Sequence, residues 1–302
     1  MGSISHYIKE IGRGKQGARS LTREQAADLF GQLLEGSVTD LEVGAFCLSM
    51  RIKGETADEM AGFLDATAAR MNRIPAGEQP LVVLPSYNGT RKLPLLTPLL
   101  ALLLAREGLP VLIHGTSTEN RRVAIAEVLE ALDIEAQASV GPVAPGTVAW
   151  MPTELLSPGL KRLLDVRRVV GLRNSSHSLV KLMNPSQGKA VIVGSYTHPE
   201  YAISMAEVFE RVGATALLLR GTEGEVVADA RRLPQMEGFI RGKRVTLEEG
   251  RRGTLTSLPE LPAEIDAAST AAYIREVLAG RKPLAASLEA QVAHIVHLSS
   301  QA

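Results

Sequence analysis

The chain has 302 residues, enough for two domains or one large one, and its apolar fraction of 45% and charged fraction of 22% are ordinary for a soluble globular protein. Its formal net charge is zero, which excludes a chain that is strongly basic or acidic as a whole. The single cysteine, Cys47, excludes an internal disulfide, and its apolar neighbours favour a packed thiol. The longest apolar run is too short to span a bilayer and the N-terminal region lacks the apolar core of a signal peptide, so we expect a cytoplasmic protein without membrane contact.

The N-terminal quarter of the chain is predicted to be helical. Thr22 and Thr56 each begin a capping-box pattern, and Asp40 is expected to cap the helix between them. Because no strand pattern interrupts these helices, we predict a small helical subdomain over residues 1–76, joined by helices around 157–185.

Beyond residue 76 the pattern changes to short apolar runs that alternate with helical segments. The runs have strand length and lie at 81–84, 109–113, 147–151, 190–193 and 215–219. This alternation predicts the fold class α/β, with a domain over 77–302 built on a mostly parallel central sheet and crossover helices. Two further helices, 269–278 and 284–298, are expected on its surface.

Polar loops follow the first two predicted strands. Because the carboxyl ends of neighbouring parallel strands meet at one sheet edge, loops 85–92 and 114–122 should line one crevice. The stretch 81–125 carries five Lys or Arg against two acids, with small hydroxyls and backbone N–H groups near a helix start. This combination suits a phosphate, and the alternative is that these are ordinary solvated loops.

Basic residues also gather elsewhere in the chain. Residues 1–23 carry five basic side chains against one acidic, and residues 156–185 carry six against one, whereas residues 24–80 carry four against ten. Such segments can converge into a basic patch that the zero net charge conceals. His294 and His297 share a predicted helix face but have no Cys or acidic partner near them in sequence, so no metal site is assigned.

Five segments share motifs with one family. They are the junction Ala45–Thr56 with its Lys-Gly-Glu-Thr, the His114-Gly115 loop, the helix 128–132, the stretch from Arg167 to Pro185, and Gly221–Gly224. In order and spacing they resemble glycosyltransferase family 3, the anthranilate phosphoribosyltransferases and nucleoside phosphorylases. The resemblance implies that family's fold, a helical subdomain and an α/β domain.

Two departures from this family concern its chemistry. Residues 86–91, Ser-Tyr-Asn-Gly-Thr-Arg, replace the Gly-Thr-Gly-Gly-Asp-Gly loop for phosphoribosyl pyrophosphate, and the paired Asp-Glu for magnesium is reduced to Glu225. Segments 8–15, 84–92 and 172–177 instead resemble the YbiB-type branch of the family. That resemblance implies a nucleic-acid-binding protein, a homodimer through the helical subdomain, with no catalytic residue, metal or cofactor.

A cationic groove can hold a nucleic-acid backbone where the family holds pyrophosphate, and the partner expected here is single-stranded DNA. Tyr87 could stack on a base. The full set of candidate phosphate-binding or nucleic-acid-binding residues is Arg13, Lys15, Tyr87, Asn88, Gly89, Arg91, Lys92, Thr97, His114, Gly115, Arg121, Arg122, Arg168, Arg173, His177 and Lys181.

Two alternatives stay open. A phosphoribosyltransferase with an altered substrate would use Glu225 alone for magnesium, and a metabolite-sensing protein would have kept the fold without the chemistry. The loss of the Gly-Gly-Asp and Asp-Glu motifs favours nucleic-acid binding over transfer.

Overall fold

The structure, a computed structural model, describes residues 3–14, 16–119, 121–251 and 259–302. The chain forms two compact units. The helical unit comprises Met1–Arg73 and Thr153–Pro185, and the α/β unit comprises Ile74–Pro152 and Ser186–Ala302.

The helical unit holds seven helices within the described residues. They are α1 (Ser5–Ile11), α2 (Arg23–Glu35), α3 (Asp40–Lys53), α4 (Ala57–Ala68), α7 (Thr153–Leu156), α8 (Pro158–Val170) and α9 (Ser176–Leu179). Its centre is an aromatic cluster in which the ring of Phe30 stacks on Phe63 at 4.6 Å and both meet the edge of Phe46. Burial of such rings is the main stabilisation that a small helical unit can obtain.

Capping boxes fix the starts of α2, α3 and α4. Those at Thr22 and Thr56 confirm the sequence prediction. The prediction for Asp40 was wrong by one residue: Thr39 caps α3, where its hydroxyl accepts from the backbone N–H of Glu42 at 3.3 Å, and Asp40 is already helical. Cys47 is buried on α3, and burial raises the pKa of its thiol to about 11, as expected of a packed thiol.

The α/β unit is built on a seven-stranded sheet of order β3-β2-β1-β4-β5-β6-β7. Five strands are parallel and match the predicted apolar runs: β1 (Leu81–Ser86), β2 (Val111–Gly115), β3 (Val148–Pro152), β4 (Ala190–Tyr196) and β5 (Ala216–Arg220). The antiparallel strands β6 (Met236–Ile240) and β7 (Lys243–Glu248), which the sequence did not predict, extend one edge. The fold class is therefore confirmed as α/β with a mostly parallel sheet.

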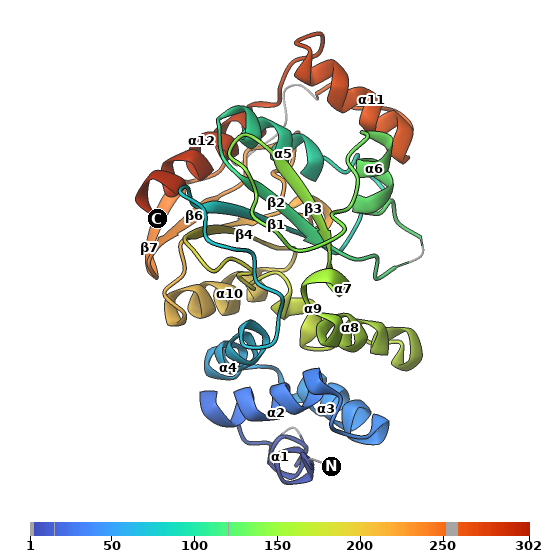
Figure 1. Ribbon diagram of the computed structural model, residues 1–302, viewed down its shortest axis with the longest axis vertical. Coiled ribbons are helices and arrows are strands. Elements are labelled where there is room, and N and C mark those ends of the chain that lie inside the picture. The colour runs from blue at the N-terminus through green and yellow to red at the C-terminus, as the bar shows by residue number, and fades with distance from the viewer. Residues whose placement is uncertain (1–2, 15, 120, 252–258) are drawn as a thin grey trace. The chain divides into compact units, whose positions relative to one another are not determined.

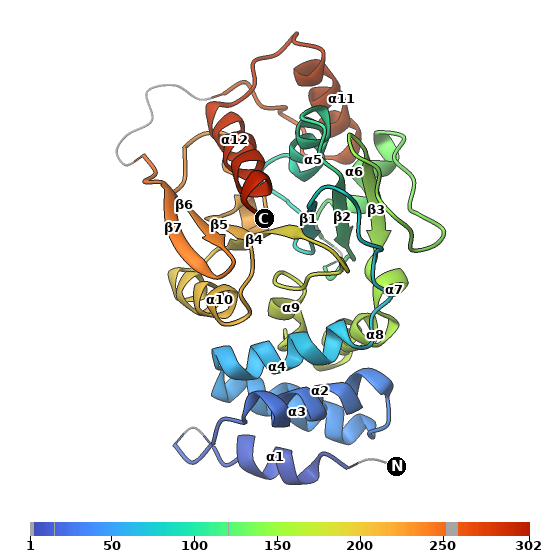
Figure 2. The same cartoon turned by 60° about the vertical axis from the view of Figure 1, so that its left-hand side comes forward.

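Helices cover both faces of this sheet, as Figures 1 and 2 show. One face carries α5 (Thr97–Arg106), α6 (Ile125–Ala131), α11 (Ala267–Leu278) and α12 (Ala286–Gln301), which enclose the main apolar core. The opposite face carries α10 (Pro199–Arg211), whose Phe209 packs against Phe239 of β6. A short 3-10 helix, η1 (Thr222–Gly224), follows β5. Within the described residues, no helix has both the length and the apolar character needed to cross a membrane.

Candidate functional site

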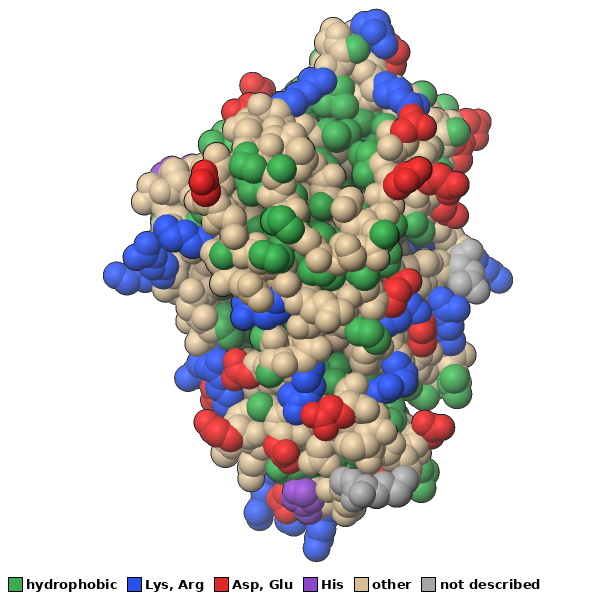
Figure 3. All heavy atoms as spheres, in the orientation of Figure 1, with side chains coloured by type: hydrophobic (Ala, Val, Ile, Leu, Met, Phe, Trp, Pro, Cys, Tyr) green, Lys and Arg blue, Asp and Glu red, His purple; other side chains and the backbone are tan. Residues whose placement is uncertain are grey.

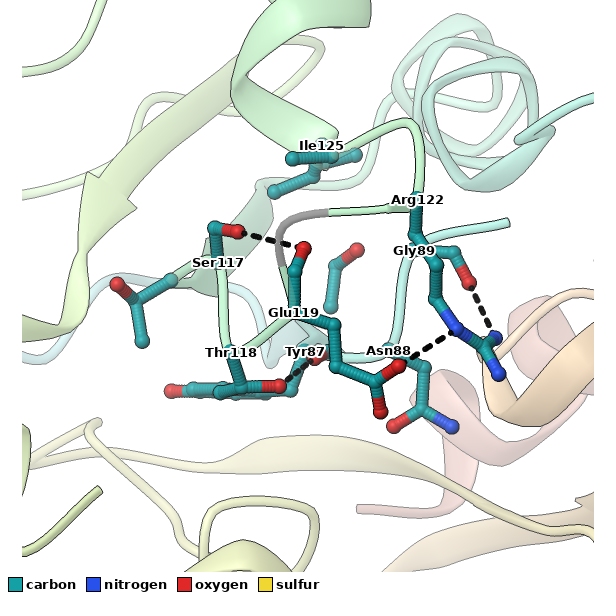
Figure 4. Close-up of a pocket in the computed structure, with 11 residues that line it drawn as sticks. Tyr87, Asn88, Gly89, Ser117, Thr118, Glu119, Arg122 and Ile125 are labelled. Carbon is teal, nitrogen blue, oxygen red and sulfur yellow. Dashed lines mark hydrogen bonds and ion pairs between the residues drawn. The ribbon is translucent and has the colours of Figure 1, made fainter. Parts of the chain in front are cut away.

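The two polar loops lie together at the carboxyl edge of the sheet. In the parallel register of β1 and β2, Ser86 is opposite Gly115, and Thr90 and Val123 exchange backbone hydrogen bonds of 3.1 and 2.8 Å. Both loops line a cavity of about 10 Å³, room for about one water molecule (Figure 4). The expected crevice is in the expected place, but it is almost closed.

One reason for its closure is Glu225, which is fully buried against the loop after β1. One carboxylate oxygen of Glu225 accepts from the backbone N–H groups of Asn88 and Gly89, both at 2.9 Å. The other accepts from the hydroxyls of Ser86 and Thr97, the latter at 3.1 Å. Four donors therefore surround this buried charge, which is the arrangement that makes burial of a carboxylate tolerable.

A second carboxylate closes the next part of the same loop. Glu223 accepts from the backbone N–H groups of Arg91, Lys92 and Leu93 at 3.2, 2.8 and 3.0 Å, and lies 3.6 Å from the Arg122 guanidinium. Its own backbone is in the left-handed region, with a φ of 51°, which costs energy for a residue with a side chain.

Glycines allow the tight turn at 221–225 and its close approach to the loop after β1. A Cβ on Gly221 would lie 1.7 Å from the carbonyl oxygen of Glu225, and one on Gly224 would lie 1.9 Å from the amide of Asn88. Gly115 has the same role at the neighbouring strand, since its Cβ would lie 1.9 Å from the Ser86 carbonyl oxygen. The close packing of β1 and β2 thus accounts for a glycine at position 115, which was one of the candidate phosphate-binding residues.

The loop is consequently an anion site that the protein fills with its own carboxylates. The N–H groups of Asn88 and Gly89 and the hydroxyl of Thr97, all predicted to hold phosphate, are bonded to Glu225 instead. The same contacts argue against magnesium at Glu225, because each of its oxygens already accepts two hydrogen bonds.

Tyr87 and His114 form a buried pair beneath the loops. The Tyr87 hydroxyl lies 2.8 Å from Nδ1 of His114, and the two side chains are 5% and 0% exposed. Burial lowers the pKa of His114 to about 3, so the ring is neutral at physiological pH. In this structure neither side chain is exposed to a base or a phosphate, so the geometry does not support stacking by Tyr87 or phosphate contact by His114.

His177 is also buried. Its Nδ1 accepts from the backbone N–H of Asn174 at 3.3 Å, and Asn174 in turn donates to the carbonyl of Leu163 at 2.8 Å. These bonds tie α9 to α8 within the helical unit. In this structure His177 therefore has a structural role within the helical unit.

The predicted cations of the α/β unit lie on the two loops, Arg91 and Lys92 on the first and Arg121 and Arg122 on the second, and we call them the rim of the filled loop. Arg91, Lys92 and Arg121 are exposed. Arg122 is half-buried and donates to Glu119 at 3.1 Å and to the carbonyl of Gly89 at 3.2 Å (Figure 4), so it holds the two loops together.

The predicted cations of the helical unit form a separate set. Arg168, on α8, is exposed and lies 3.3 Å from Asp165, while Arg173 and Lys181 are half-buried around α9. Arg13 is exposed and paired with Glu10 at 2.7 Å. Lys15 lies outside the described residues.

The sequence missed the role of Glu223 and Glu225 as acceptors for the loop. Glu225 was considered only as a remnant metal ligand, because its partner Ser86 is 139 residues away in the chain. One signal in the sequence could have indicated this role. Relative to the transferases, the loop has lost its glycines and the acidic motif near residue 225 has changed as well.

Comparison with known proteins identifies the fold and its relatives. The helical bundle domain model of the glycosyl transferase family matches residues 5–71. The protein YbiB of Escherichia coli K12 is 41% identical over 297 residues, which cover 95% of this chain and 91% of YbiB. An anthranilate phosphoribosyltransferase of Methylobacterium nodulans is 28% identical over 298 residues, covering 93% and 84%.

Solved structures agree with these relatives. Anthranilate phosphoribosyltransferase from Thermus thermophilus matches with a TM-score of 0.76 at 22% identity, covering 98% of this chain and 89% of that one. Phosphoribosyltransferases are thus the more distant relatives, and they share the fold. With 41% identity over nearly the full length of both chains, the protein belongs to the family of YbiB, on the glycosyltransferase family 3 fold.

Proposed function

We propose that the protein binds nucleic acid through its phosphate backbone, with single-stranded DNA as the partner, and does not transfer phosphoribosyl groups. The observation that supports this most is the filling of the loop at 86–93 by Glu223 and Glu225. The yeast anthranilate phosphoribosyltransferase has been solved with phosphoribosyl pyrophosphate and magnesium. In the present chain, carboxylates occupy the donors that such a polyanion needs.

Exposed cations at the rim of this loop support binding of a strand. The side chains of three cations are exposed: Arg91, Lys92 and Arg121. A nucleic-acid strand lies along the protein surface, so its phosphates are bound by exposed cations and do not require a closed pocket. Since Tyr87 is buried, base stacking at this loop does not contribute, and we expect little sequence preference.

Fluorescence anisotropy of a labelled single-stranded oligonucleotide, titrated at several salt concentrations, tests the proposal. The wild-type affinity should fall steeply as salt rises. The variant Arg91→Ala/Arg121→Ala should bind more weakly, and the slope of log K against log salt should become shallower by about 0.7 for each phosphate that the variant no longer neutralises.

A matched control removes two exposed cations from other parts of the same unit, Lys243→Ala/Arg281→Ala. This variant should keep the wild-type slope. Absence of binding by the wild-type protein at low salt would refute the proposal. Equal losses of affinity in the two double variants would show that the rim of the loop is not the binding surface.

The transferase alternative has its own assay. With phosphoribosyl pyrophosphate, magnesium and anthranilate or another amine acceptor, pyrophosphate release should stay at the level of a protein-free control. Magnesium-dependent release that also requires the acceptor would establish transfer and refute the non-catalytic proposal.

A further inference from the structure

A second site in the α/β unit is separate from the small cavity between the loops. It is an open pocket of about 720 Å³ at the carboxyl ends of β4 and β5, where Tyr196 and Arg220 are register partners. The segments after β5 and after β7 also line it, together with Lys92 and Leu93 from the loop after β1. In parallel sheets this edge is where small ligands bind, and the volume is that of a ligand of nucleotide size.

The charges that line the pocket are predominantly positive. Five cations stand against three acids, and two of those acids are already engaged within the protein. Asp229 forms a bidentate pair with the Arg231 guanidinium at 2.9 and 2.7 Å, and Glu223 accepts from the loop after β1. Arg220 and Arg251 thus line a pocket with one remaining acid, Glu249. Guanidinium groups that line one pocket suit phosphate oxygens.

The remaining wall is less polar. Tyr196 is half-buried and lines the pocket beside Leu233 and Pro234. An aromatic and apolar wall next to a cationic one matches a ligand with a flat ring at one end and phosphate at the other. Inorganic phosphate alone would leave most of this volume unfilled.

We propose that this pocket binds a free nucleoside phosphate, with the phosphates at Arg220 and Arg251 and the base against Tyr196. The pocket shares Lys92 with the rim of the loop, but the rim cations Arg91 and Arg121, which the nucleic-acid test replaces, do not line it. A free nucleotide and a nucleic-acid strand both carry a base and phosphate, so the test must distinguish binding of one from binding of the other.

Isothermal titration calorimetry of the full chain at low salt uses ATP, AMP and inorganic phosphate as probes. ATP should bind, and inorganic phosphate should bind at least about tenfold more weakly because it lacks the base. The variant Arg220→Ala/Arg251→Ala should lower the affinity for ATP at least about tenfold, whereas the control Lys243→Ala/Arg281→Ala should keep the wild-type affinity. Tyr196→Ala should weaken ATP and leave inorganic phosphate unchanged.

Anisotropy with the labelled oligonucleotide separates this site from the nucleic-acid site. Arg220→Ala/Arg251→Ala should leave oligonucleotide affinity within about twofold of wild type. Three results would each overturn the proposal: no ATP binding by the wild type, equal wild-type affinities for ATP and inorganic phosphate, or similar losses of ATP affinity and oligonucleotide affinity in this variant.

Discussion

At the scale of single residues, two glutamates determine what the loop after β1 can do. Glu225 and Glu223 accept from backbone N–H groups of five residues between Asn88 and Leu93. Hydrogen bonds from several donors to a charged acceptor are strong, and removing Glu225 would leave the buried N–H groups of Asn88 and Gly89 without their acceptor. The loop conformation therefore depends on these side chains.

Replacing Glu225 by Gln should destabilise the protein by about 2–4 kcal/mol. The amide N–H₂ would face donors that now meet a carboxylate oxygen, and the charge that four donors surround would be lost. Urea unfolding measures the change, with the exposed Glu249→Gln as a control expected within about 0.5 kcal/mol of wild type. A Glu225→Gln protein as stable as wild type would contradict this account.

His114 should make the protein sensitive to acid. Its pKa is about 3 when folded and about 6.5 in an unfolded chain, so below pH 6.5 the unfolded state takes up a proton that the folded state does not. Stability should therefore fall as pH falls from about 6.5 toward 3, by up to about 1.4 kcal/mol per pH unit. Unfolding curves of His114→Asn should show a shallower pH dependence over this window, while the exposed His297→Asn should keep the wild-type one.

Sequence reasoning located this site but did not predict its state. Apolar runs and turn residues placed both loops at one sheet edge, because strand ends follow from local pattern. The contacts of Glu225 with Ser86 and Asn88 join residues 139 and 137 positions apart, and no local pattern encodes them. For the same reason the burial of Tyr87 was missed.

At the scale of elements, the parallel strands were predictable and the antiparallel pair was not. The first five strands are apolar on both faces because helices cover both sides of the sheet. β7 reads Lys-Arg-Val-Thr-Leu-Glu and is largely exposed at the edge, and β6 contains Gly238, so neither has the composition of a buried strand.

The correction at α3 can be tested directly. Thr39→Ala removes the hydroxyl that accepts from Glu42, and should cost about 0.5–2 kcal/mol of unfolding free energy. Asp40→Ala should cost less, because Asp40 lies inside the helix. If the two variants lost the same unfolding free energy in thermal or urea unfolding, Thr39 would not be the residue that caps α3.

An exposed apolar stripe on α3 supports the prediction of a homodimer through the helical unit. Leu41, Leu48 and Ile52 are 84%, 48% and 58% exposed and recur at helical spacing on one side. Leu48→Glu/Ile52→Glu should halve the mass measured by light scattering, whereas Ile203→Glu on α10, which is 64% exposed, should not. A wild-type protein that is already monomeric would contradict the prediction.

At the scale of the whole molecule, zero net charge does not preclude nucleic-acid binding, because affinity depends on local charge. On the face shown in Figure 3, Lys and Arg side chains are interspersed with Asp and Glu, with no broad field of one sign among the residues drawn in colour. Because the net charge is zero, binding should be of moderate strength for one subunit and should gain from two linked copies.

This expectation predicts a dependence on strand length. The Leu48→Glu/Ile52→Glu variant should bind an oligonucleotide of about 8 nucleotides as the wild type does, but a strand of about 40 nucleotides more weakly, because only the longer strand can engage both subunits. Anisotropy with the two strands measures the difference. An equal loss for both lengths would show that the substitutions damage the binding surface itself.

The mutual dependence of the loop and its glutamates also bears on how such a protein can change over generations. A return to a glycine-rich loop would strip Glu225 of its hydroxyl partner at Ser86, and a loss of Glu225 first would leave the present loop without its acceptor. Each single step passes through a less stable intermediate. A change of the loop in either direction therefore requires substitutions at both places together.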